Sequence, residues 1–213
     1  MESSSMDNHE SLRFFGKVSA SVSHEIKNVF AVINESAGLL GDLSLMAEKG
    51  MPMDPERMKK VATSIQGQVQ RGDCIIKNMN KLAHSTDEAA LEVDLTQVVE
   101  LAVALSTRMA DMKQMRLSVG ECAPAKVVVS PFKLIQLLHG ATSLALDKMS
   151  SQATLAFSVA EGDDKATIIL SVPGQGINLT CDEALEALAA DMDATACSNK
   201  LDGTLELSFK RTV

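Results

Sequence analysis

Apolar residues at helical spacing run through the first part of the chain, from about Ser11 to Lys49. Steps of three and four put side chains on one face of a helix, and they connect Phe15, Val18, Val22, Ile26, Val29 and Ile33, then Leu40, Leu43 and Met46. A second series follows GMPMDP, in which Asp54 suits a helix N-cap and Pro55 the first helical position. It ends near AHST and contains Met58, Val61, Ile65, Ile75 or Ile76, Met79 and Leu82. Two long helices with a short connection predict an antiparallel hairpin over residues 11–86.

A lone hairpin has an apolar face and nothing to bury it against. Pairing of two hairpins into a dimeric four-helix bundle is the economical solution, so we expect a homodimer. Packing of the hairpin on the C-terminal half of the same chain is the competing possibility.

The pattern changes at residues 86–93, TDEAALEV, and residues 93–213 are predicted to form an α/β sandwich. The expected elements are a helix over 95–112, short strands RLSV and KVVV, a helix PFKLIQLLHGATSLALDKM opened by Ser130 and Pro131, strands ATLAFSVA and KATIILSV paired through the turn EGDDK, a weak helix around 182–192 and a last strand GTLELSFK. The fold class is therefore a helical hairpin followed by an α/β domain.

Charge and composition exclude several classes of function. A net charge of −8 argues against non-specific nucleic-acid binding, which needs basic patches. No uninterrupted apolar run approaches the roughly 18 residues of a membrane span, and the polar start MESSSMDNHE lacks the pattern of a signal peptide. We therefore expect a cytoplasmic protein with no membrane contact. The four scattered cysteines lack metal-ligand spacing and are expected to be free, buried thiols.

One histidine of the first helix lies off its apolar face. His24 is about 200° from Val22 around the helix axis, on the side that faces water. Glu25 beside it can accept a proton or orient the ring, and Asn28 one turn later can position water or a phosphoryl oxygen. Lys27 adds positive charge for a phosphoryl group. A solvated surface histidine is the plain alternative.

The sequence SHEIKN, followed by its apolar run, resembles the phospho-acceptor box of bacterial sensor histidine kinases, which reads roughly H-E-[IL]-[RK]-N. In that family the histidine is phosphorylated, the glutamate is its general base, and the residue four positions on assists dephosphorylation of the partner aspartate. The resemblance implies these roles for His24, Glu25 and Asn28. It extends from about Gly16 to the C-terminus and implies a kinase-like ATP-binding domain in the second half.

That second half departs from the family at three places. QLLHGATSLALDKM resembles the helix that carries two asparagines in the family, but Gly140 and Leu144 stand at those positions, and leucine cannot coordinate Mg²⁺. SVPGQGINL resembles the adenine-binding box, but Val172 replaces its aspartate and cannot accept a hydrogen bond from adenine. The glycine-rich lid is absent, and an acidic, helix-like run stands in its place. We expect a degenerate domain without nucleotide, cofactor or metal.

These observations favour a histidine phosphotransferase that relays a phosphoryl group between response-regulator aspartates through His24. Mg²⁺ is expected only on the partner receiver domain, which would supply most of the charge stabilisation. The surface expected to meet the receiver comprises Lys27, Ala31, Glu35, Arg71, Gly72 and Ile75. A response-regulator phosphatase, a non-catalytic dimeric scaffold or inhibitor, and a kinase with an altered nucleotide site remain as alternatives.

Overall fold

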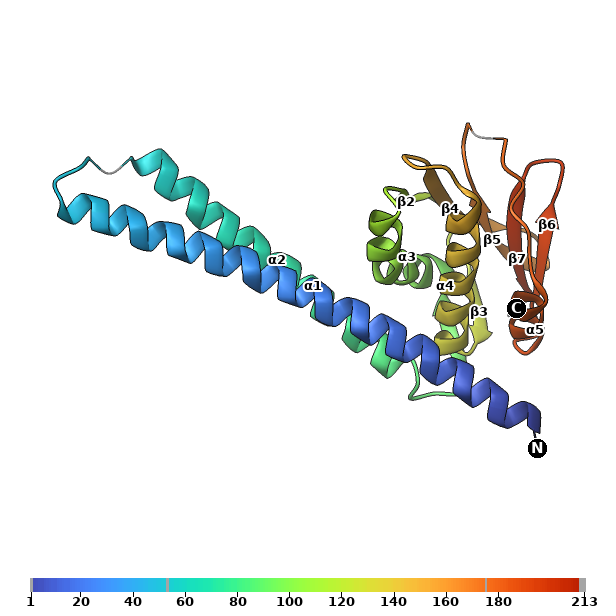
Figure 1. Cartoon of the computed structure of the whole chain (residues 1–213). Helices are drawn as coiled ribbons and strands as arrows, with labels where there is room; N and C mark the ends of the chain where they lie inside the picture. The colour runs from blue at the N-terminus through green and yellow to red at the C-terminus, as the bar shows by residue number, and fades with distance from the viewer. Residues whose placement is uncertain (1, 53, 175, 211–213) are drawn as a thin grey trace. The chain divides into compact units, whose positions relative to one another are not determined.

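The computed structural model describes residues 2–52, 54–174 and 176–210, with side chains described from His9 onward. It divides into two compact units (Figure 1). The hairpin unit comprises residues 15–80, and the sheet unit comprises the residues up to 14 together with those from 81 onward. The sequence-based division at residues 86–93 falls a few residues later in the chain.

The hairpin unit is built from α1 (Glu2–Glu48) and α2 (Pro55–His84). The connection turns at Gly50, whose φ of 79° is the left-handed conformation that glycine adopts without strain. Asp54 caps α2 as predicted, because its carboxylate accepts the Glu56 N–H at 2.9 Å. The helix α1 begins about nine residues earlier than the apolar pattern indicated, which corrects the expectation of a polar tail before Ser11.

Tertiary contacts hold α1 at Ser11 and Phe14. Ser11 Oγ donates to Gln136 Oε1 at 3.2 Å, and the Phe14 ring packs edge-on against Phe132 and His139 with centroid distances of 5.5 and 5.1 Å. These contacts lie within the sheet unit. They join this part of α1 to the residues 131–148.

Besides the ends of α1 and α2, the described part of the sheet unit contains two sheets and three helices. The two-stranded sheet pairs β1 (Leu91–Asp94) antiparallel to β3 (Lys126–Val129). The five-stranded sheet has the order β2-β4-β5-β7-β6, with β2 (Arg116–Cys122), β4 (Thr154–Glu161), β5 (Lys165–Ser171), β7 (Thr204–Lys210) and β6 (Thr195–Asn199). The helices are α3 (Leu95–Met112), α4 (Pro131–Lys148) and α5 (Glu183–Ala190). Only β2 and β4 run parallel, so the sheet is mixed.

Alternation along the strands decides which face of the large sheet is buried. In β5 every second residue is buried, and Ile168 and Leu170 are fully inside. Phe157 of β4 and Phe209 of β7 join them on the same face, which α3 and α4 cover. The core is aliphatic with a few phenylalanines, as a chain without Trp or Tyr requires.

Most of the predicted elements are confirmed, including the Ser130 cap of α4 and the antiparallel pair β4 and β5. Two short strands were missed. β1 has only four residues, two of them charged, and β6 is the polar edge strand TACSN. Both exist because a neighbouring strand offers its hydrogen bonds, which a local pattern does not reveal.

The cysteines are free, as expected, but none is buried. Cys74 and Cys197 are exposed, and Cys122 and Cys181 are partly covered. The prediction of buried thiols is therefore wrong, most clearly for Cys74 of α2 and Cys197 of β6.

One described helix could cross a membrane by length and composition alone. It is α1 from His9 to Glu48, and only 11% of its most apolar window is buried. A single such helix is weak evidence for a span, because an amphipathic helix with two apolar stripes passes the same test. The absence of membrane contact stays a prediction.

Candidate functional site

His24 lies on the exposed side of α1. The direction in which α1 meets α2 is marked by Val29, whose Cγ1 would be 3.3 Å from a Cβ built on Gly72. His24 is about 140° from that direction around the helix axis. The antiparallel spacing, with Val29 facing Gly72 and Ser36 Oγ 3.4 Å from Ser64 Oγ, puts His24 level with Ile76 and Lys77 of α2. The imidazole is therefore accessible to an approaching macromolecule.

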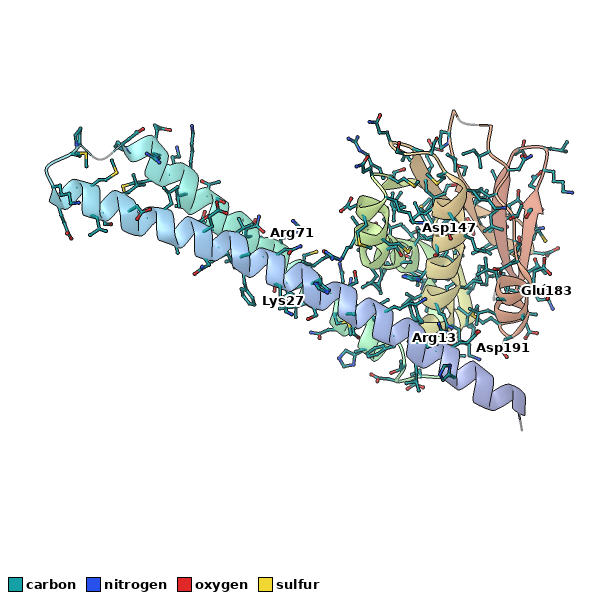
Figure 2. All side chains as sticks on the ribbon, viewed as in Figure 1. Arg13, Lys27, Arg71, Asp147, Glu183 and Asp191 are labelled. Atoms are coloured by element: carbon teal, nitrogen blue, oxygen red, sulfur yellow. The ribbon has the colours of Figure 1, made fainter. Side chains whose placement is uncertain are left out.

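Glu25 differs from His24 in its surroundings. Its side chain is only 17% exposed, and its Oε2 lies 3.9 Å from Nη2 of Arg71, whose side chain is 57% exposed. Arg71 projects from α2, as Figure 2 shows. The carboxylate is thus held at the junction of the two helices, with an arginine on its outer side.

Gly72 lies between the helices and is buried. An added Cβ at this position would be 3.3 Å from Val29 Cγ1, closer than packed side chains usually approach. Gly72 therefore serves the close approach of α2 to α1, whereas the sequence suggested a surface for a partner. Its neighbour Arg71 turns by about 100° from that contact, toward the side that carries His24.

Most of the other residues expected to meet a partner are exposed. Lys27, Ala31 and Glu35 are exposed on α1, and Asn28 is exposed one turn after His24. Figure 2 shows Lys27 on the hairpin. Ile75 of α2 is half-buried. The hairpin therefore brings His24, Glu25, Asn28 and Arg71 to one side.

In the sheet unit, α5 and the residues on either side of it contact α4 at three points. Lys133 pairs with Asp191, Leu185 packs over Gly140, and Lys148 donates to Thr180 Oγ1. A Cβ at Gly140 would be 3.0 Å from Leu185 Cδ2. Leu185 itself is 5% exposed. The position that the sequence aligned with the first asparagine of kinases is thus covered by an apolar side chain.

The other two aligned positions are also apolar. Leu144 of α4 is half-buried, and Val172, just after β5, is 8% exposed. Val172 lines an open cavity of about 380 Å³ with Gly174, Gly176, Asn178 and Asp202. Asp147 of α4 pairs with Lys113, which follows α3. Among the side chains that the structure describes, no group of three or more His, Cys, Asp or Glu residues gathers as metal ligands would.

Two contacts of the site were missed from the sequence. The pairing of Glu25 with Arg71 joins residues 46 positions apart on different helices. The packing of Leu185 on Gly140 joins α4 to a helix predicted only weakly. The isolated glycines at 72 and 140, which are costly in helix interiors, were the available signals, because each accommodates a close neighbour.

The sequence matches no known protein-family profile and no curated protein. The fold is similar to sensor histidine kinases of known structure. Acinetobacter baumannii histidine kinase AdeS has 13% identity and a TM-score of 0.46, covering 83% of this chain and 94% of its own. Histidine kinase ThkA, solved in complex with response regulator protein TrrA, has 15% identity and a TM-score of 0.48, covering 96% of this chain and 64% of its own.

A mycobacterial sensor histidine kinase, MprB, has 11% identity and a TM-score of 0.45, covering 57% of this chain and 97% of its own. All three scores lie below 0.5, so this likeness does not by itself assign a function. Function is argued below from the chain's own side chains.

Proposed function

We propose that this chain is a histidine phosphotransferase, which accepts a phosphoryl group on His24 from the aspartyl phosphate of one response-regulator receiver domain and passes it to another. The observation that supports this choice is the packing of Leu185 over Gly140, because an apolar side chain then covers the position that aligns with the first asparagine of the kinase helix. An accessible histidine without a nucleotide site of its own must be charged by a partner.

The transfer step uses residues on the His24 side of the hairpin. The lone pair of one ring nitrogen attacks the phosphorus, and the bond from phosphorus to the donor carboxylate oxygen breaks, leaving that carboxylate with the electron pair. Glu25 accepts the proton of the other ring nitrogen as the new bond forms. The second transfer runs the same steps in reverse, with a second receiver's carboxylate as the nucleophile.

Exposed neighbours of His24 suit the approach of the receiver. Asn28 has amide groups that can contact a phosphoryl oxygen, and Lys27 adds positive charge nearby on the same helix. The receiver would bring its own Mg²⁺, so this chain needs no metal ligands. Such a partner is found in the cytoplasm, which is where we place the protein.

Dimerisation is part of the proposal and is supported by exposed apolar residues on the opposite side of the hairpin. Phe30 is 63% exposed and lies about 100° from Val29, in the sense opposite to His24. On α2, Val69 and Ile76 are 55% and 52% exposed and are turned the same way from Gly72. Because the helices are antiparallel, residues turned in the same sense from Val29 on α1 and from Gly72 on α2 lie on the same side of the hairpin. Phe30, Val69 and Ile76 therefore share one side, where a second hairpin can bury them.

The test is to incubate the protein with a phosphorylated receiver and follow the label. We expect an acid-labile, base-stable adduct on the wild type and none on His24→Ala. Autophosphorylation of the wild type with Mg-ATP would contradict the proposal. Receiver binding without any labelled adduct would leave a scaffold in its place.

A receiver phosphatase is the second candidate, favoured by the exposure of Asn28 one turn after His24. Here Asn28 would orient the attacking water. Phosphate release that survives His24→Gln and is lost in Asn28→Ala would identify this activity, whereas a relay loses transfer in His24→Gln.

A further inference from the structure

The contact between Glu25 and Arg71 is where the two helices are joined beside His24. A carboxylate that is 17% exposed needs a compensating group, and the guanidinium of Arg71 is 3.9 Å from it. The distance is longer than that of a tight hydrogen-bonded pair, so the contact is an electrostatic attraction between the guanidinium and the carboxylate.

The spacing of the helices at this point is set by Gly72. Val29 Cγ1 would be 3.3 Å from a Cβ at Gly72, so the backbones approach closely there. Arg71 precedes Gly72, and Glu25 lies one turn before Val29 on the same side of the hairpin. The close approach therefore brings the guanidinium within reach of the carboxylate.

We propose that Arg71 is a positioning residue, which acts through Glu25 by holding its carboxylate on the His24 side of the hairpin, where it can accept the ring proton. The inference rests on the proposed function only for the identity of the phosphoryl donor. Without Arg71, the Glu25 side chain samples other rotamers, and fewer encounters with a donor find the base in place.

The first experiment measures single-turnover transfer from a phosphorylated receiver. We expect Arg71→Gln to slow transfer by about 10- to 100-fold, which is less than the roughly 10²- to 10⁴-fold effect of general acid–base assistance because the base itself remains. Arg71→Lys should restore part of the rate, because it keeps the charge. The matched control is Arg57→Gln, an exposed arginine near the start of the same helix, which should leave the rate unchanged.

A double-variant cycle separates action through Glu25 from direct contact with the receiver. In a Glu25→Gln background, Arg71→Gln should have little further effect. Additive losses, or a loss of receiver affinity equal to the loss of rate, would overturn the proposal. Thermal unfolding of each variant checks that the hairpin is still folded.

A second experiment needs no receiver. Phosphoramidate, a small phosphoryl donor, is reacted with the full chain, and modification of His24 is followed by peptide mapping, which separates it from the other three histidines. Arg71→Gln and Glu25→Gln should slow modification of His24 to a similar extent. Slowing here with no transfer from any receiver would reject the proposed function and keep the role of Arg71, and equal rates in wild type and variants would reject that role.

Discussion

The backbone conformation and the close neighbours of Gly203 exclude a side chain at this position. Its φ of +69° already disfavours a side chain, and a Cβ would lie 2.7 Å from the Ile177 carbonyl oxygen. Gly174, across the same cavity, has a φ of +79° but open space where a Cβ would be built. Substituting Gly174 therefore tests backbone strain alone, whereas substituting Gly203 tests strain together with a steric collision.

We expect Gly203→Ala to lower the free energy of unfolding by about 3 kcal/mol, since collision adds to the strain. Gly174→Ala should cost about 1 kcal/mol, from strain alone. Urea unfolding followed by circular dichroism measures both. Equal losses in the two variants would show that the loop relaxes around the new methyl group.

The ionisation of Cys181 differs from that of an ordinary thiol. Burial, with smaller contributions from Glu186 and Asp182, raises the pKa of its thiol from about 9 to about 11. At pH 8 to 9 we expect iodoacetamide to alkylate Cys181 much more slowly than the exposed Cys74 and Cys197. Mass mapping of the folded protein measures this, and denatured protein, in which all four cysteines should react alike, is the control.

The raised pKa of the Cys181 thiol also predicts how the stability of the protein changes with pH. Below pH 9 the thiol is neutral in both folded and unfolded chains, so its contribution to stability is fully present. Between pH 9 and 11 the unfolded chain loses the proton first, and stability falls. Cys181→Ser should lack this part of the decline, and identical pH profiles for the two proteins would contradict the assignment.

At the scale of elements, α5 is a helix of eight residues that depends on its contacts. Asp182 caps it by accepting the Leu185 N–H at 2.9 Å, and Leu185 supplies its apolar anchor on α4. We expect Leu185→Ala to destabilise the protein by about 2 to 3 kcal/mol. Leu201→Ala, at a leucine that is 97% exposed, is the matched control and should change stability little.

The same helix predicts the outcome of restoring kinase-like residues. Asparagine at position 140 would collide with Leu185, so the triple variant Gly140→Asn, Leu144→Asn, Val172→Asp should still show no ATP binding by calorimetry. Adding Leu185→Gly removes the collision and tests whether α5 is the obstacle. Micromolar ATP binding by the triple variant alone would show that α5 gives way.

How well each element could be predicted depends on whether its own residues carry the pattern. α2 and α4 have periodic apolar faces and capping residues at Asp54 and Ser130, so both were found from the sequence. The strand β6 forms on a surface supplied by a distant part of the chain, because its hydrogen-bond partner is β7. The first turns of α1, before Ser11, have no apolar periodicity and were missed. The same holds for the site. The motif SHEIKN is local and was found from the sequence, whereas the pairing of Glu25 with Arg71 joins two helices and was missed.

For the whole molecule, the stripe on the side of the hairpin away from His24 predicts the state of association. Phe30→Glu combined with Val69→Glu should convert a dimer into a monomer, because two charges would be buried in the bundle. Light scattering coupled to size-exclusion chromatography measures the mass. Val32→Glu, at a residue 37% exposed on the His24 side, should leave the dimer intact. A wild type that is monomeric at micromolar concentration would refute the dimer.

The helix packed over Gly140 has a consequence for energetics. If the chain relays phosphoryl groups without using nucleotide, as we propose, it adds no driving force of its own, and His24 only brings the phosphorylation of two receivers toward equilibrium. Phosphoryl groups then move from the more highly phosphorylated receiver to the other one. The direction reverses when the kinase that phosphorylates the first receiver stops. Phosphotransfer through such a chain is reversible, and its net direction depends on the phosphorylation of its partners.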